Sequence, residues 1–198
     1  MINKYIFLFS LLFFVIACGR NMPKNYPNTY TDIIAFGDSL TYGYGATQNE
    51  SYPAYLSQIL DREIINLGIN GDTSAMGLAR ITEIENYSPY MVLVEFSAND
   101  FFRQIPREQT EKNLRQMVEY LQKLGAIVVL VDTGGAYPMD TYTKIQKRLA
   151  KEYNTLFVPG ILDGIYNKKS LKSDQVHPNA EGYKIVAQKV NKVIKNYL

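Results

Sequence analysis

Short apolar runs alternate with amphipathic helical patterns along most of this 198-residue chain. The runs have the length of strands that are buried on both faces, and the stretches between them have the apolar spacing of helices. The expected strands are residues 32–36, 64–67, 91–96, 127–131 and 156–158, and the expected helices are residues 52–60, 73–86, 107–124, 141–153 and 180–197. Such alternation requires parallel strand pairing, because each helix returns the chain to the same end of the sheet. The sequence therefore predicts one α/β domain, a three-layer α/β/α sandwich around a parallel sheet.

The first apolar run stops at Gly37, Asp38 and Ser39, which are turn-forming and helix-capping residues. In a parallel sheet, the loops that follow the strands lie at one edge, where open α/β sheets place their ligands. Ser39 is therefore a candidate nucleophile. A serine in a strand-to-helix turn is usually only a helix cap, so this role requires a base, an orienting group and an oxyanion site elsewhere in the chain.

The loops after the second and third expected strands supply candidate oxyanion donors. Gly71 precedes a capping residue, Asp72 or Thr73, which leaves its backbone N–H free at the start of a helix. Asn99 carries an amide donor at the same edge of the sheet. Each also has an ordinary interpretation, since glycine and asparagine are common in turns.

Asp174 and His177 lie just before the last expected helix, and His177 is the only histidine of the chain. A spacing of three residues in a turn lets a carboxylate reach Nδ1 of the imidazole, which leaves Nε2 as a base toward a serine. A lone histidine is otherwise more often structural or exposed. If the loops converge, the chain contains a triad of Ser39, His177 and Asp174.

The composition excludes several classes of site and partner. One cysteine and one histidine exclude a disulfide framework and any metal site that needs several Cys or His ligands. The formal net charge is +2, and no basic cluster resembles a nucleic-acid footprint. A metal site made of carboxylates alone stays possible but has no motif behind it, so we expect no metal and no nucleic-acid partner.

The amino terminus is typical of an exported protein. Lys4 precedes an apolar run of about 12 residues, too short to span a bilayer comfortably. The run ends at Ala17 and Cys18, which resembles a bacterial lipoprotein signal, although Ile16 stands where a small residue is more usual. A plain signal peptide or an uncleaved anchor is the alternative.

The lipoprotein interpretation divides the chain into three parts. Residues 1–17 would be removed, Cys18 would be lipidated, residues 18–30 would form a tether, and residues 31–198 would form the folded domain. This predicts a lipid-anchored protein of the bacterial cell envelope that faces the periplasm or the exterior.

The sequence blocks together resemble the SGNH (GDSL-type) hydrolase family. The matching residues are Gly37-Asp38-Ser39-Leu40, Gly71, Asn99-Asp100, and Asp174 and His177 with Pro178, Gly182 and Tyr183. The stretches most similar to the secreted arylesterase and thioesterase/lysophospholipase branch are Asn70-Gly71-Asp72-Thr73-Ser74 and Gly77-Leu78-Ala79-Arg80. One position departs from the family, which usually has glycine where this chain has Ser97.

The resemblance implies a five-stranded parallel, flavodoxin-like sheet and a serine esterase. Ser39 would attack an ester carbonyl, His177 would take its proton and Asp174 would orient His177. The backbone N–H groups of Ser39 and Gly71 and the side chain of Asn99 would hold the oxyanion. This chemistry needs no cofactor.

Substrate identity is less constrained by the sequence. Short-to-medium acyl esters, thioesters and lysophospholipids fit this branch, carbohydrate O-acetyl esters are an alternative, and a non-catalytic glycan- or lipid-binding surface lipoprotein is another. Aromatic residues in the expected site loops are candidates for an apolar acyl pocket or for ordinary packing: Tyr42, Tyr44, Phe101, Phe102 and Tyr137.

Overall fold

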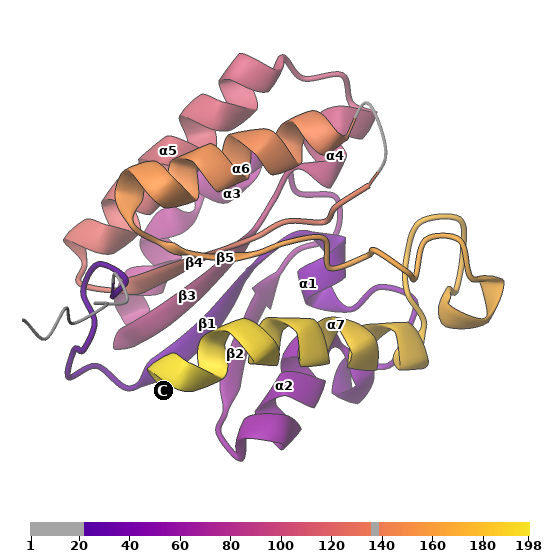
Figure 1. Cartoon of the computed structure of the whole chain (residues 1–198), viewed down its shortest axis with the longest axis horizontal. Helices are drawn as coiled ribbons and strands as arrows, with labels where there is room; N and C mark the ends of the chain where they lie inside the picture. Colours follow the sequence, from indigo (N-terminus) through magenta and orange to yellow (C-terminus); the bar gives the residue numbers. More distant parts are fainter. Residues whose placement is uncertain (1–21, 136–138) are drawn as a thin grey trace, which may run out of the picture.

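A computed structural model describes residues 22–135 and 139–198 and has the predicted α/β architecture (Figure 1). Five strands form one sheet in the order β2-β1-β3-β4-β5, and every pairing is parallel. The strands are β1 (Asp32–Gly37), β2 (Ile64–Gly68), β3 (Pro89–Glu95), β4 (Ile127–Val131) and β5 (Leu156–Val158). The expected three-layer sandwich with a five-stranded parallel, flavodoxin-like sheet is confirmed.

Helices cover both faces of the sheet. The longer ones are α2 (Tyr52–Leu60), α3 (Ser74–Ala79), α5 (Arg107–Lys123), α6 (Asp140–Tyr153) and α7 (Ala180–Ile194). The short ones are α1 (Ser39–Tyr42), α4 (Ala98–Phe102) and four 3₁₀ turns, η1 (Gln48–Glu50), η2 (Ile81–Asn86), η3 (Lys169–Leu171) and η4 (Lys195–Tyr197). In Figure 1, α3, α5 and α6 lie on one face of the sheet, and α2 and α7 lie on the other.

The central strands contribute alternate side chains to two separate hydrophobic cores. In β1, Ile33 and Ala35 belong to the core under α2 and α7, whereas Ile34 and Phe36 belong to the core under α3, α5 and α6. Strands β3 and β4 divide their side chains in the same way. Because both faces are covered, the middle positions of these strands are apolar in an unbroken run instead of alternating with polar residues.

One expected helix is divided in two. The sequence predicted a helix over residues 73–86, but α3 stops before Arg80 and the 3₁₀ turn η2 follows. The Arg80 side chain turns toward the sheet, where it donates hydrogen bonds to Asp72 and to the carbonyl of Gly37. The apolar spacing continues through this break, which is why the pattern does not reveal it.

Residues 22–30, which we expected to belong to a tether, lie against the domain at the amino-terminal edge of the sheet. Nδ2 of Asn25 donates to the carbonyls of Gln122 and Ala126, at 2.9 Å each. Tyr26 packs edge to face on Tyr197, with ring centroids 5.5 Å apart. The described part of this segment is therefore attached to the fold instead of free.

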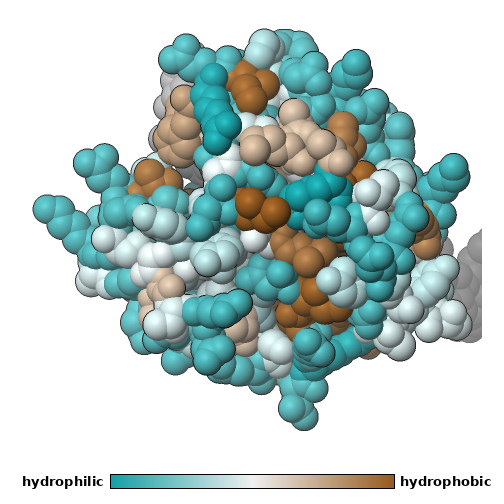
Figure 2. Space-filling model, turned by 180° about the vertical axis from the view of Figure 1, so that it is seen from behind, coloured by the Kyte–Doolittle hydropathy of each residue, from teal (hydrophilic) through white to brown (hydrophobic). Residues whose placement is uncertain are grey.

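The described surface is mostly polar. Figure 2 shows a largely hydrophilic rear face on which hydrophobic residues gather in a few patches. Within residues 22–135 and 139–198, no helix combines the length and the apolar character needed to cross a membrane.

The contacts of Asn25 predict that residues 22–30 contribute to stability. Asn25→Gly keeps the positive backbone φ of 68° accessible but removes both hydrogen bonds. We expect a loss of about 1–3 kcal/mol in the free energy of unfolding, measured by urea denaturation. Thr29→Ala, at an exposed position of the same segment, is the control. Equal stability of the two variants would contradict this account.

Candidate active site

Three of the predicted site residues form a hydrogen-bonded row at the carboxyl edge of the sheet. Oγ of Ser39 lies 3.0 Å from Nε2 of His177, and Nδ1 of the same ring lies 2.7 Å from Oδ2 of Asp174. Ser39 is the first residue of α1, directly after β1, and the other two lie in the loop before α7. Loops from the two ends of the chain thus meet, as the parallel topology predicted.

The second oxygen of Asp174 is also occupied. Oδ1 accepts the backbone N–H groups of Val176 and His177, at 2.7 Å each. Partial burial acts to raise the pKa of Asp174, but the hydrogen bonds from His177 and Val176 outweigh it and lower this pKa to about 2. Asp174 is therefore a carboxylate at every ordinary pH, so it accepts the Nδ1 proton of His177 and leaves Nε2 to face Ser39.

The His177 ring is held from a second side. The ring of Tyr44 packs on it with centroids 4.6 Å apart, and the backbone carbonyl of Tyr44 accepts the hydroxyl of Tyr183 at 2.8 Å. Tyr183 lies on α7, the helix that follows the histidine loop. Of the aromatic residues predicted near the site, Tyr44 therefore supports the histidine.

The turn that carries Ser39 requires its glycine and its aspartate. A Cβ on Gly37 would lie 2.1 Å from Oγ1 of Thr41 and 2.7 Å from the carbonyl of Glu95, so no larger residue fits. Oδ1 of Asp38 caps α1 by accepting the N–H of Leu40 at 2.9 Å. The Gly-Asp-Ser sequence is thus a close approach between two strands followed by a helix cap.

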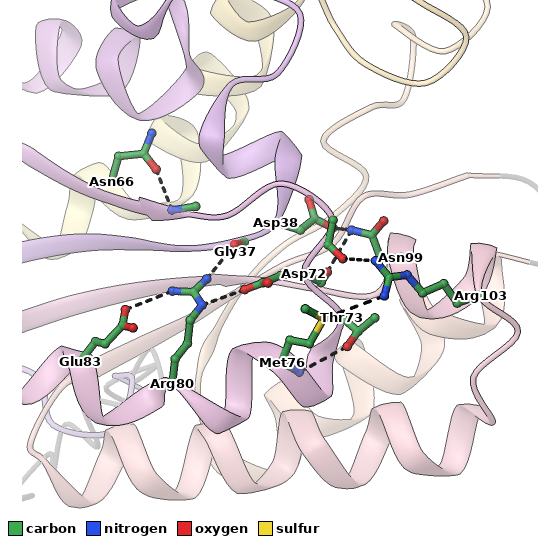
Figure 3. Close-up of polar contacts among 12 residues, drawn as sticks. Gly37, Asp38, Asn66, Asp72, Thr73, Met76, Arg80, Glu83, Asn99 and Arg103 are labelled. Carbon is green, nitrogen blue, oxygen red and sulfur yellow. Dashed lines mark hydrogen bonds and ion pairs between the residues drawn. The ribbon is translucent and has the colours of Figure 1, made fainter.

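The loop after β2 presents Gly71 with a backbone φ of 81°, a conformation suited to glycine. The Gly71 carbonyl accepts a hydrogen bond from Arg103 at 2.7 Å, and the next residue, Asp72, pairs with Arg80 at 2.7 Å. Figure 3 shows both arginines beside this loop. Gly71, whose N–H would hold the oxyanion, is therefore anchored on its carboxyl side by two arginines.

The side chain of Asn99 lies between the first and second loops (Figure 3). Its Nδ2 donates to Oδ2 of Asp38 at 3.0 Å and to the carbonyl of Asp72 at 2.9 Å. Because two acceptors face it, the amide is oriented with its nitrogen toward these loops. Both Nδ2 hydrogens have an acceptor here, so an oxyanion would share one of them.

Ser97, where the family usually has glycine, has a backbone conformation that L residues rarely adopt. Its φ is 157° and its ψ is −26°. The Ser97 hydroxyl accepts a hydrogen bond from Gln146 at 3.4 Å. The structure thus explains the family's glycine, because glycine adopts the φ of the turn into α4 without strain.

A cavity of about 130 Å³ opens beside the candidate nucleophile. Ser39, Asn99 and His177 form one part of its wall. The rest of the lining is mainly apolar and consists of Leu40, Ala98, Phe102, Thr133, Gly134, Met139, Leu162, Tyr166 and Val176.

Of the aromatic residues predicted to form an acyl pocket, Phe102 lines this cavity. Tyr42 lies on the outside of the molecule, 49% exposed, because α1 ends there at the surface. Phe101 points toward α6, where its ring lies 6.3 Å from that of Tyr142. Tyr137 lies outside the described residues.

The sequence reasoning missed part of the wall because, in the long segment between the fifth strand and the last helix, it considered only the residues around Asp174 and His177. Leu162 and Tyr166 lie earlier in that segment, just after β5, whose carboxyl end lies at the same edge as the others. The edge rule, applied to the start of this segment, would have included them. In the parts of the chain that the structure describes, no cluster of three or more His, Cys, Asp or Glu side chains is arranged to hold a metal ion.

Comparison with known proteins identifies the class. Residues 35–185 match the model of the GDSL-like lipase/acylhydrolase family. A similar protein is the thioesterase 1/protease 1/lysophospholipase L1 of Escherichia coli (strain K12), 30% identical over 164 residues that cover 78% of this chain and 79% of the relative. The arylesterase of Vibrio mimicus is 29% identical over 178 residues, or 84% and 89% of the two chains.

A solved structure agrees with the sequence comparisons. The esterase AlinE4, described as a member of the SGNH-hydrolase family, is 32% identical and superposes with a TM-score of 0.68 over 85% of this chain and 95% of its own. The fold and these relatives define a hydrolase that acts on ester bonds. The chain belongs to the GDSL-like lipase/acylhydrolase family, which confirms the resemblance read from the sequence.

The backbone of Ser97 predicts that glycine is better at this position. Ser97→Gly should raise the unfolding temperature by a few degrees, because it removes strain of about 1–3 kcal/mol at the cost of one long hydrogen bond. Ser97→Ala is the matched control, since it loses the same bond and keeps the Cβ. Scanning calorimetry that finds Gly no more stable than Ala would show that the turn is unstrained.

Proposed function

We propose that this protein is a serine esterase that hydrolyses short-to-medium acyl esters or thioesters, with Ser39, His177 and Asp174 as its triad. The observation that carries the proposal is the row of hydrogen bonds from Ser39 through His177 to Asp174, which ends at an apolar cavity. A chain that only bound ligands would have no need for this alignment, because it serves to move a proton from a hydroxyl.

The reaction follows from the atoms of the row. Oγ of Ser39 attacks the ester carbonyl carbon while Nε2 of His177 takes the hydroxyl proton, and the resulting oxyanion is tetrahedral. When it collapses, His177 returns the proton to the leaving alcohol or thiol and an acyl-serine remains. A water molecule then attacks the acyl-serine with the same base, which releases the acid and restores Ser39. Asp174, ionised throughout, stabilises the imidazolium in both steps.

The oxyanion has three candidate donors at this edge. They are the backbone N–H groups of Ser39 and Gly71 and the Nδ2 group of Asn99. The arginine contacts of the Gly71 loop and the two acceptors around Asn99 hold these groups before substrate arrives. Donors that are already oriented stabilise the transition state without a cost of reorganisation.

The cavity favours an acyl chain as its occupant. Apart from Ser39, Asn99 and His177, the described residues of its wall have polar side-chain groups only at Thr133 and Tyr166. A sugar hydroxyl inside it would lose hydrogen bonds to water, whereas a hydrocarbon chain would bury apolar area at about 25 cal/mol per Å². A carbohydrate ester would therefore have to place its sugar outside, as the leaving group.

We expect Ser39→Ala to lower kcat about 10⁴-fold or more on p-nitrophenyl esters with no loss of unfolding temperature. The same panel, from C2 to C16 and beside acetylated glycans, should show highest kcat/KM on short or medium chains. Ser170→Ala, in the exposed turn η3, is the control. A folded, fully active Ser39→Ala enzyme would exclude the triad, and a preference for acetylated glycans would assign the site to carbohydrate esters.

We also propose that the protein is held on a membrane by a lipid anchor on Cys18, a residue that lies outside the described part of the chain. The support is the sequence pattern of a short apolar run that ends at Ala17 and the only cysteine. Two acyl chains on this residue would hold the enzyme stably on a bilayer.

The described start of the chain determines how such an anchor would orient the enzyme. The carbonyl of Met22 accepts a hydrogen bond from Asn154 at 2.7 Å, beside the amino end of β5, whereas the site lies at the carboxyl ends of the strands. Four residue steps from Cys18 to Met22 span at most about 14 Å. An anchored Cys18 would therefore direct the site away from its own bilayer, which favours substrates that diffuse to the enzyme over phospholipids of that leaflet.

Cys18→Ala should move the protein out of the membrane fraction, as a released enzyme or as uncleaved precursor. Mass spectrometry of the wild-type amino-terminal peptide should find a diacylated cysteine. Ser39→Ala, which leaves the signal intact, should remain in the membrane fraction. An unmodified Cys18 would exclude the anchor and leave the esterase proposal standing.

A further inference from the structure

Two buried carboxyl groups lie under the nucleophile and have no part in the triad. Asp38 and Glu95 are both 0% exposed, and their carboxyl groups lie close enough to share a hydrogen bond. Within residues 22–135 and 139–198, no lysine or arginine forms an ion pair with either of them. Two carboxylates in contact without a cation cannot both be ionised, so the pair holds a proton.

The contacts of Glu95 show where the proton lies. Oε2 of Glu95 accepts the hydroxyl of Thr41 at 3.1 Å, and Thr41 lies 3.3 Å from the hydroxyl of Tyr52. Among the described residues, Oε1 has no hydrogen-bond donor. A proton on Oε1 would satisfy this atom, with the neighbouring Asp38 carboxylate as its acceptor. Burial raises the pKa of Asp38 to about 6 and that of Glu95 well above the ordinary range of a glutamate, in agreement with a neutral Glu95.

Asp38 also contacts Asn99, the candidate oxyanion donor. Its Oδ1 caps α1 through Leu40, and its Oδ2 accepts Nδ2 of Asn99 (Figure 3). A carboxylate can only accept, so Asp38 excludes the flipped amide, whose oxygen would face the carboxylate in place of Nδ2. The chain of contacts thus runs from Glu95 through Asp38 to Asn99.

We propose that Glu95 is a positioning residue for the oxyanion donor Asn99, because as a neutral acid it donates to Asp38 and so holds the Asp38 carboxylate against the Asn99 amide. This inference rests on the proposed esterase function. Glu95 touches no substrate and acts through Asp38 alone.

Few other ionisable groups face the pair. The imidazole of His177 lowers the pKa of Asp38, and Asp72, which is paired with Arg80, raises it. From α2 and α7, the hydroxyls of Tyr52 and Tyr183 face the two carboxyls, and burial raises the pKa of both phenols. These phenols stay neutral, so the charge of the pair depends on its own proton and on His177.

A double-mutant cycle tests whether Glu95 acts through Asn99. Asn99→Ala should lower kcat by about 10²–10³-fold, the usual effect of losing one oxyanion donor. Glu95→Ala should lower kcat about 10–100-fold and leave KM within about threefold, whereas Glu95→Gln should restore kcat because its amide N–H also donates to Asp38. In the double variant, Glu95→Ala should cost little beyond Asn99→Ala.

The pH dependence of stability tests the shared proton separately. A Glu95 whose pKa is raised by burial stays protonated when the unfolded chain has lost that proton, so the stability of the wild type falls as the pH rises. Gln carries no proton to lose. The unfolding temperature of Glu95→Gln minus that of the wild type should therefore increase between pH 5 and pH 8.

Leu121→Ala is the control, since it removes a fully buried core side chain of α5 and should lower the unfolding temperature without lowering kcat. A Glu95→Ala enzyme with the kcat of this control would show a structural role only. Three other outcomes would each overturn the inference. The first is that the kcat losses of Glu95→Ala and Asn99→Ala multiply in the double variant. The others are that Glu95→Gln fails to restore kcat, or that its difference in unfolding temperature from the wild type does not grow with pH. If Ser39→Ala remained active, the esterase proposal itself would fail, and the two failures are thereby distinguished.

Discussion

The register of the three central strands is the constraint on which the site depends. Gly37, the last residue of β1, is paired with Gly68 of β2 on one side and with Glu95 of β3 on the other. Three loops therefore leave the sheet side by side, and each carries one group of the site. The turn that follows β1 packs against the ends of both β1 and β2. Neither Gly37 nor Gly68 has room for a Cβ there, because Thr41 and Tyr42 lie against them.

Buried aspartates fasten the loops at this edge. Asp38, Asp72, Asp100 and Asp132 follow β1, β2, β3 and β4 in turn, and each is at most 4% exposed. Asp100 accepts hydrogen bonds from Ser74 and Thr110, and Asp132 accepts them from Thr143 and the backbone of Gly160. Burial of a carboxylate is costly unless its oxygens are satisfied, so each one fixes its loop in the single geometry that supplies the donors. The site is rigid because its loops are tied individually.

Strand periodicity, the edge rule and the sequence blocks were sufficient to predict the sheet, its parallel order and the meeting of Ser39, His177 and Asp174. These depend on spacing along the chain, which a sequence displays. The break in the helix at Arg80 and the position of Leu162 in the cavity wall depend on residues that are far apart in the sequence and close in space. The spacing of apolar residues does not report such contacts. Glu95 stands out in the sequence only as a charged residue at the end of an apolar run, because its partner Asp38 is close in space and distant along the chain.

The contact of Tyr26 with Tyr197 brings the first described residues and the carboxyl terminus together at the end of the sheet remote from the site (Figure 1). Chain ends that lie close together at a surface tolerate being joined or extended. This end can thus carry a fusion partner, a solid support or a short peptide that joins the two ends, and none of these would cross the entrance of the cavity. The fold thus places an attachment point at one end of the sheet and the chemistry at the other.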